Sequence, residues 1–141
     1  MKEDIKSLEA EAAVIPKGNE SILFVDDEEM LVQLEREMAE SFGYKVTIAN
    51  SSWKALEIFE SHKDKFDLII TDQTMPGMTG VELAKEIWKI HPDIPIILTT
   101  GFSYVVDEDQ TRDMGFSGFL KKPINREVLV STIRKVLDRK N

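Results

Sequence analysis

The 141-residue sequence contains no cysteine, and this absence excludes disulfides and thiolate metal sites. A reducing compartment is compatible with it. No apolar run approaches the length of a membrane-spanning helix. The first residues also lack the continuous apolar core of a signal peptide. We therefore expect a cytoplasmic protein without membrane insertion.

The sequence also has no excess of basic residues. It carries 18 Lys and Arg against 26 Asp and Glu, for a formal net charge of -8. This balance argues against a nucleic-acid surface, which needs clustered cations to neutralise phosphates, and against binding an anionic membrane. With 42% hydrophobic and 31% charged residues, the chain has the composition and length of one ordinary globular domain.

Residues 1–20 differ from the rest of the chain. Apolar residues recur there at helical spacing until Pro16 and Gly18 interrupt them, and these are Ile5, Leu8, Ala12 and Ile15. So short an amphipathic helix is marginal without a partner surface. We interpret residues 1–20 as a linker or an N-terminal helical extension from an upstream domain, preferring the linker, and residues 21–141 as the domain.

From residue 21 onward, short apolar runs alternate with helical patterns. The expected strands are residues 21–25, 44–49, 66–71, 94–99 and 116–120. Short connections and nearly continuous apolar strands predict a parallel sheet with helices on both faces. The expected fold class is α/β: a doubly wound five-stranded sheet of flavodoxin-like order 2-1-3-4-5.

Four of the expected helices carry informative patterns. The first places Leu31, Leu34, Met38 and Phe42 on one face and ends near Gly43. Thr79 and Glu82 have the spacing of a capping box. The fourth, over residues 103–114, has few apolar anchors, and we expect it to be mobile; a final amphipathic helix covers residues 125–139.

Polar side chains follow four of the five strands. In the expected strand order the carboxyl ends of these strands meet at one edge of the sheet, which brings together Asp26, Asp27, Asp72, Thr100 and Lys122. Each residue alone is weak evidence, because an Asp after a strand is usually a helix cap and a Lys before Pro is usually solvated. Together they place carboxylates, a hydroxyl group and an amine in one crevice.

This combination of side chains suits phosphoryl transfer. Three crowded carboxylates repel unless a cation intervenes, and hard oxygen ligands without thiolate or imidazole select Mg²⁺. A metal would keep Asp72 ionised and able to attack phosphorus. Lys122 and Thr100 could bind the phosphoryl oxygens, while Gly101 leaves room for the group.

Four motifs carry a resemblance to a known family: ILFVDDEE, IITDQTMPGMTG, PIILTTG and FLKKP. In this order and spacing, residues 21–138 resemble the receiver domain of two-component response regulators. The resemblance implies that Asp72 accepts a phosphoryl group from a sensor histidine kinase or a histidine phosphotransfer protein. It implies that Thr100 and Lys122 bind that group, and that the Lys122–Pro123 peptide is cis.

The resemblance also implies the metal ligands. Asp27 and Asp72 would bind Mg²⁺ directly with the backbone carbonyl of Thr74, while Asp26 would act mainly through metal-bound water. The implied cofactor is therefore Mg²⁺, and the expected chain is not a stand-alone turnover enzyme.

Signalling residues are implied in the same way. Phe119 would be an aromatic switch working with Thr100, in a position where related domains often carry Tyr. Phe102 and Thr74 occupy positions that tune the lifetime of the acyl phosphate, and we expect Phe102 to shield it from water. The output surface, and a possible homodimer contact, would be formed by residues 103–114, 116–120 and 125–139.

Several alternatives stay open. The chain is either a stand-alone receiver or the receiver module of a hybrid sensor histidine kinase, and the GNESILFVDDEE and ILTTGFS runs favour the second. An aspartyl-phosphate phosphohydrolase is a rival, but such enzymes place a second Asp where this sequence has Thr74. Flavin binding is disfavoured because three carboxylates would repel the cofactor phosphate.

Overall fold

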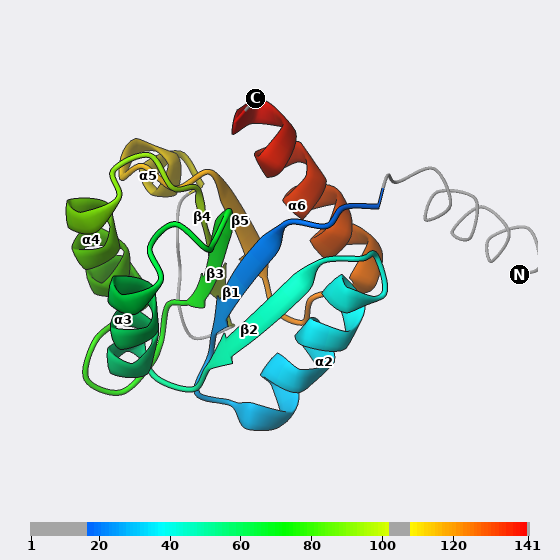
Figure 1. The fold of residues 1–141 in the computed structure, drawn as a ribbon. Coiled ribbons are helices and arrows are strands. Elements are labelled where there is room, and N and C mark those ends of the chain that lie inside the picture. The colour runs from blue at the N-terminus through cyan, green and yellow to red at the C-terminus, as the bar shows by residue number, and fades with distance from the viewer. Residues whose placement is uncertain (1–16, 102–107, 141) are drawn as a thin grey trace, which may run out of the picture.

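The computed structural model describes residues 17–101 and 108–140. Within them, five strands alternate with five helices (Figure 1): β1 Ser21–Val25, α2 Glu29–Glu40, β2 Lys45–Ala49, α3 Ser52–Ser61, β3 Leu68–Asp72, α4 Gly80–Ile90, β4 Ile96–Thr100, α5 Glu108–Asp113, β5 Gly118–Lys121 and α6 Arg126–Lys140.

All strand pairs are parallel, and the sheet order is β2-β1-β3-β4-β5. This confirms the predicted flavodoxin-like α/β fold. Helices α2 and α6 cover one face of the sheet, and α3 and α4 cover the other (Figure 1). The two faces are therefore both buried, as the nearly continuous apolar strands require.

Alternation along the strands divides the core into two layers, because successive side chains point to opposite faces. On β1, Leu23 and Val25 pack with Ala55 and Phe59 of α3. The intervening residues of β1 pack toward the other face, where the buried set comprises Ile22, Phe24, Val32, Leu68, Ile70, Leu129 and Ile133. The sheet thus lies between two apolar layers.

Side-chain caps begin two of the helices, and the one at Thr79 and Glu82 was predicted. The Ser51 hydroxyl accepts a hydrogen bond from the Lys54 backbone N–H at 3.1 Å. Thr79 and Glu82 form the complete capping box at the start of α4. Strands β2 to β5 each begin one or two residues later than predicted.

The predicted inner face of α2 was right in part, because Phe42 is buried and Met38 packs against the core, but wrong at Leu34. Leu34 is 49% exposed, whereas Val32, Glu35 and Ala39 are the buried residues of this helix. Apolar residues occupy two adjacent faces of α2, and the sheet selects the one that begins at Val32. The carboxylate of Glu35 is consequently buried against the sheet.

The fourth of the five described helices, α5, is short. Helix α5 spans six residues, and Thr111 is the buried residue on it. The predicted start of this helix falls on residues 102–107, outside the described part of the chain. No helix among the described residues is both long and apolar enough to cross a bilayer.

An ion-pair network closes the amino end of the sheet. Arg134 on α6 donates to both carboxylate oxygens of Glu20, at 2.7 and 3.2 Å, and to the Tyr44 hydroxyl at 3.2 Å. The hydrogen bonds to Arg134 lower the pKa of Glu20. The Gly18 N–H donates to the Phe42 carbonyl at 3.0 Å, so this stretch before β1 is bound to the domain.

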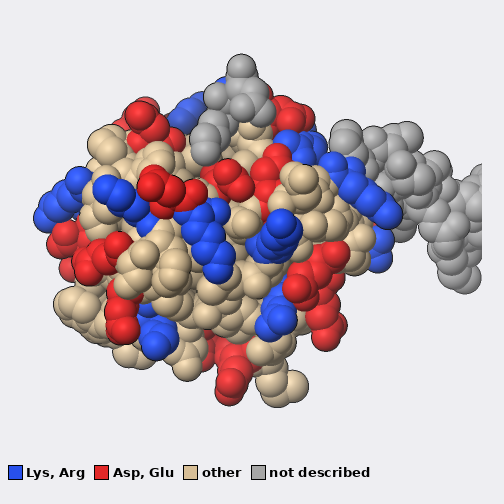
Figure 2. Space-filling model, viewed as in Figure 1, with Lys and Arg blue, Asp and Glu red and all other residues tan. Residues whose placement is uncertain are grey.

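Surface charge is mixed on the face shown in Figure 2. Basic and acidic side chains are interspersed there over the described helices rather than gathered by sign. This arrangement lacks the continuous basic stripe that a nucleic-acid backbone would need on that face.

Candidate functional site

The site is built where four strands end. Asp26 and Asp27 follow β1 directly, and Asp72 is the last residue of β3. The parallel register sets Asp72 opposite Thr99 and Thr100 opposite Lys121. Because parallel strands end at the same edge, side chains from distant parts of the sequence meet there.

Three carboxylates come together at this edge. One oxygen each from Asp26, Asp27 and Asp72 lies within 4.8 Å of the others. Asp72 is only 5% exposed and Asp26 is also buried, whereas Asp27 is exposed to solvent. The predicted acidic cluster is thus assembled, with its open side at Asp27.

Lys122, the residue after β5, reaches into the cluster. Its Nζ donates to Asp26 Oδ2 at 2.8 Å and lies 3.4 Å from Asp72 Oδ1. Its backbone N–H donates to the Thr100 carbonyl at 2.8 Å, which fixes the start of the loop. The peptide between Lys122 and Pro123 is cis, as predicted.

Charge in the cluster is not balanced. Burial, and then the neighbouring Asp26 charge, raise the pKa of Asp72 to about 6, although Lys122 opposes the shift. Burial by itself would lower the pKa of Lys122, but its hydrogen bond to Asp26 and the nearby carboxylates raise it. The lysine therefore stays charged, and the carboxylates outnumber it.

Glu35 is a member of this electrostatic environment that the sequence did not reveal. Its side chain is 2% exposed, and its Oε1 is the one buried side-chain polar atom without a hydrogen-bond partner in the described residues. Burial, followed by the Asp26 charge, raises its pKa to about 7. A glutamate among helix residues normally reads as solvent-facing, so no sequence signal marked it.

The loop after Asp72 is held by residues that sequence reasoning also missed. The buried Gln73 accepts a hydrogen bond from the Val81 N–H through its Oε1 at 2.9 Å. The Ser52 hydroxyl donates to the Met78 carbonyl at 2.6 Å. A Cβ at Gly80 would collide with the Asp72 carbonyl, so only glycine allows α4 to begin this close. The turn residues of the IITDQTMPGMTG motif were the sequence feature that could have indicated this tightly held loop.

Three of the four remaining predicted residues are in the described part of the chain. Thr100 is buried at the end of β4, and Thr74 is exposed two residues after Asp72. Phe119 is half-buried on β5 and lines a cavity beside α5 and α6. Phe102 falls outside the described residues.

The donor set fits Mg²⁺. Three carboxylate oxygens are close enough to share one ion, and all are the hard ligands that this ion prefers. Burial, and then the Asp26 charge, raise the pKa of Asp72 despite Lys122, so its ionised form is disfavoured without a further cation. A divalent cation would neutralise the carboxylate charge.

A family model describes residues 22–134 as a response regulator receiver domain. The chain belongs to this family. Receiver domains pair with histidine kinases in two-component signalling, and they are generally not turnover enzymes. An aspartate triad of this kind is typical of the receiver magnesium site.

Solved receiver structures share the fold closely. A response regulator receiver domain protein from Clostridium thermocellum superposes with a TM-score of 0.78 at 32% identity, covering 86% of this chain and 96% of that one. The chemotaxis protein CheY4 of Vibrio cholerae gives 0.74 at 30% identity, over 84% of this chain and 99% of that chain.

Curated relatives are longer proteins. The sensor kinase CckA of Brucella abortus is 32% identical over 137 residues, which is 96% of this chain but 14% of the kinase. The transcriptional regulatory protein GlrR of Escherichia coli is 32% identical over 83% of this chain and 26% of its own length. The receiver therefore spans only a small part of each of these relatives.

Proposed function

We propose that this receiver accepts a phosphoryl group on Asp72 from a phosphohistidine donor, a histidine kinase or a histidine phosphotransfer protein. The observation that carries the proposal is the position of Asp72. It is a buried carboxylate at a strand end, 3.4 Å from a charged lysine and in one cluster with two further carboxylates.

In the proposed step, an Oδ atom of Asp72 attacks phosphorus. The new O–P bond forms as the N–P bond of the phosphohistidine breaks, and its electron pair returns to the imidazole nitrogen. Lys122 would transfer its Nζ from Asp26 to a phosphoryl oxygen, while Thr100 would offer its hydroxyl to another. The open side at Asp27 is the approach for the donor.

Asp26, Asp27, Asp72 and the Thr74 carbonyl would hold Mg²⁺ in this proposal, Asp26 mainly through water. When bound, the ion would supply the positive charge that keeps Asp72 ionised and neutralises phosphoryl oxygens. The half-buried Phe119 and the face formed by α5, β5 and α6 would then carry the signal to a partner or to a second copy of the chain.

We propose further that residues 21–141 are the receiver module of a hybrid sensor histidine kinase, preceded by a linker over residues 1–20. The match to the Brucella abortus kinase covers 96% of this chain, whereas the family model begins at residue 22. At that coverage the similarity includes part of residues 1–20. Such a module is cytoplasmic, and the length of the native reading frame tests this origin.

Acetyl phosphate with Mg²⁺ tests the phosphoacceptor role. Intact mass spectrometry should show one phosphoryl adduct, stable in acid and labile in base, that is absent from Asp72→Asn. Asp64→Asn, which removes an exposed carboxylate elsewhere, is the matched control and should be modified like the native chain. An adduct that persists in Asp72→Asn, or multiple-turnover hydrolysis of phosphate esters, would refute the proposal.

A further inference from the structure

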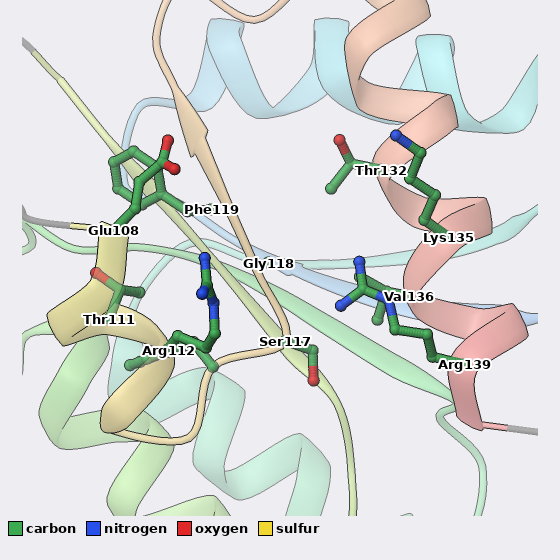
Figure 3. A pocket seen from close by; sticks show the side chains of 11 residues that line it. Glu108, Thr111, Arg112, Ser117, Gly118, Phe119, Thr132, Lys135, Val136 and Arg139 are labelled. Atoms are coloured by element: carbon green, nitrogen blue, oxygen red, sulfur yellow. The ribbon is translucent and has the colours of Figure 1, made fainter.

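The cavity that Phe119 lines lies between α5 and α6, and its lining includes none of Asp26, Asp27 and Asp72 (Figure 3). Its volume is about 390 Å³, and β5 contributes Gly118 and Phe119 to its lining. This volume is within the range of small-molecule sites, roughly 300–1,000 Å³. The cavity is therefore large enough to hold a ligand, and its lining indicates which kind.

Cationic side chains line it from both helices. Arg112 on α5 and Arg139 on α6 turn their guanidinium groups into the space between the helices, and Lys135 lines the same cavity (Figure 3). None of the ion pairs recorded among the described residues involves Lys135 or Arg139. Lys135 and Arg139 are four residues apart on α6, a spacing at which like charges repel.

The compensation available to Arg112 is weak. Within the described part of the chain it forms an ion pair with Asp109 at 3.7 Å, and the two side chains are 72% and 81% exposed. An ion pair so exposed contributes little. Arg112, Lys135 and Arg139 thus line the cavity against one carboxylate, Glu108, and this local excess of positive charge favours an anionic occupant.

The opposite end of the cavity has different chemistry. Figure 3 shows Glu108 and Phe119 at the end away from Arg139. The half-buried Phe119 ring offers a surface on which a flat base can stack. The Glu108 carboxylate accepts hydrogen bonds, and the amino group of a base is a suitable donor.

We propose that this cavity binds a nucleoside diphosphate or triphosphate, with the base on Phe119 beside Glu108 and the phosphates among Arg112, Lys135 and Arg139. Arginine matches phosphate geometry with paired N–H donors, and lysine adds a mobile charge. Guanine suits Glu108 best, because its amino group and ring N–H lie side by side.

Binding to this cavity would also regulate the receiver. The ligand stacks on Phe119, and phosphorylation at Asp72 would move the same ring; whatever shifts one equilibrium shifts the other. This second part rests on the proposed phosphoacceptor function, whereas binding itself does not.

The binding test uses the full chain carrying Asp72→Asn, so that phosphorylation cannot contribute. Titration calorimetry with GDP should give one saturable site, and Arg139→Met should weaken the Kd about tenfold. Lys54→Met removes one exposed charge on α3, outside this cavity, and should leave the Kd unchanged. Equal losses in the two variants would mean nonspecific attraction and would overturn the proposal.

Phe119→Leu separates base recognition from charge. It should weaken GDP binding several-fold and leave pyrophosphate binding as it was, because pyrophosphate has no ring to stack. Equal effects on both anions would overturn the assignment of the base. Binding of hexaglutamate but not of GDP would likewise refute a nucleotide site and indicate an acidic peptide.

The regulatory part is tested on the native chain with acetyl phosphate and Mg²⁺. Saturating GDP should change the rate of adduct formation at least twofold. GDP binding with no change of rate would refute the coupling alone. Failure to form any adduct would instead refute the phosphoacceptor proposal and leave the binding result standing.

Discussion

The two ends of β1 carry ion-pair networks that differ in burial and in how their carboxylates are paired. Before the strand, Glu20 and Asp138 share Arg134, and all three are joined by hydrogen bonds of 2.7–3.2 Å. After the strand, Lys122 lies among Asp26 and Asp72, with Glu35 buried nearby. In the first network both carboxylates are hydrogen-bonded to Arg134, whereas beside the second the buried Glu35 Oε1 has no hydrogen-bond partner among the described residues.

The pKa shifts of the two networks have opposite consequences. The pKa of Glu20 is lowered by its hydrogen bonds to Arg134, so ionisation of that carboxyl stabilises the fold. The pKa values of Asp72 and Glu35 are raised to about 6 and about 7, so ionisation there destabilises it. The ionised carboxylate at the amino end of the sheet therefore stabilises the fold, whereas the ionised carboxylates at the carboxyl end destabilise it unless a cation binds.

The largest expected effect is that of Glu35→Gln. The pKa of this carboxyl rises from its ordinary 4.5 to about 7 in the folded state, so the native chain loses stability as pH increases through that window. This pKa difference lowers the free energy of unfolding of the native chain by about 3 kcal/mol at pH values above that window. Urea denaturation without metal should find the variant more stable by that amount at about pH 8 and nearly equal to the native chain at about pH 4.

Glu37→Gln is the control for this measurement, because Glu37 lies on the exposed side of α2. It should change the free energy of unfolding by less than about 0.5 kcal/mol at either pH. If Glu35→Gln destabilised the chain at high pH, the contrast between the two ends of the sheet would be lost.

Asp72→Asn should have the next largest effect. Its carboxyl shifts from 3.8 to about 6, and the native chain loses stability as pH rises between those values. Neutralising it should raise the free energy of unfolding by about 2–3 kcal/mol at neutral pH without metal. Millimolar Mg²⁺ should shrink that gap, because binding to the native carboxylates stabilises the native chain. A gap that Mg²⁺ left unchanged would contradict the metal site.

The sequence was sufficient for the carboxylates that end strands. Asp26, Asp72 and Lys122 could be predicted to meet, because apolar runs set the strands and the parallel order sets which ends converge. Those steps depend on local patterns and a small number of allowed topologies.

Burial on α2 and the network at the amino end could not be predicted. Leu34 and Val32 begin two competing apolar faces, and only packing against the sheet decides that Glu35 is buried. Glu20 and Arg134 are 114 residues apart and leave no local pattern. Both depend on how α2 and α6 sit on the sheet, which periodicity does not specify.

The smallest expected effect is that of Arg134→Met, and its sign should be opposite. Removing the guanidinium leaves the partly buried Glu20 without its charged partner, which should lower the free energy of unfolding by about 1–2 kcal/mol at neutral pH. Because the pKa of Glu20 is lowered in the folded state, the contribution of the pair disappears as pH falls through that lowered value. Arg36→Met is the matched control: its pair with Glu40 is 3.1 Å long but 41% and 42% exposed, so it should change stability by less than about 0.5 kcal/mol. Equal losses in the two variants would mean that the network before β1 contributes no more than an ordinary surface pair.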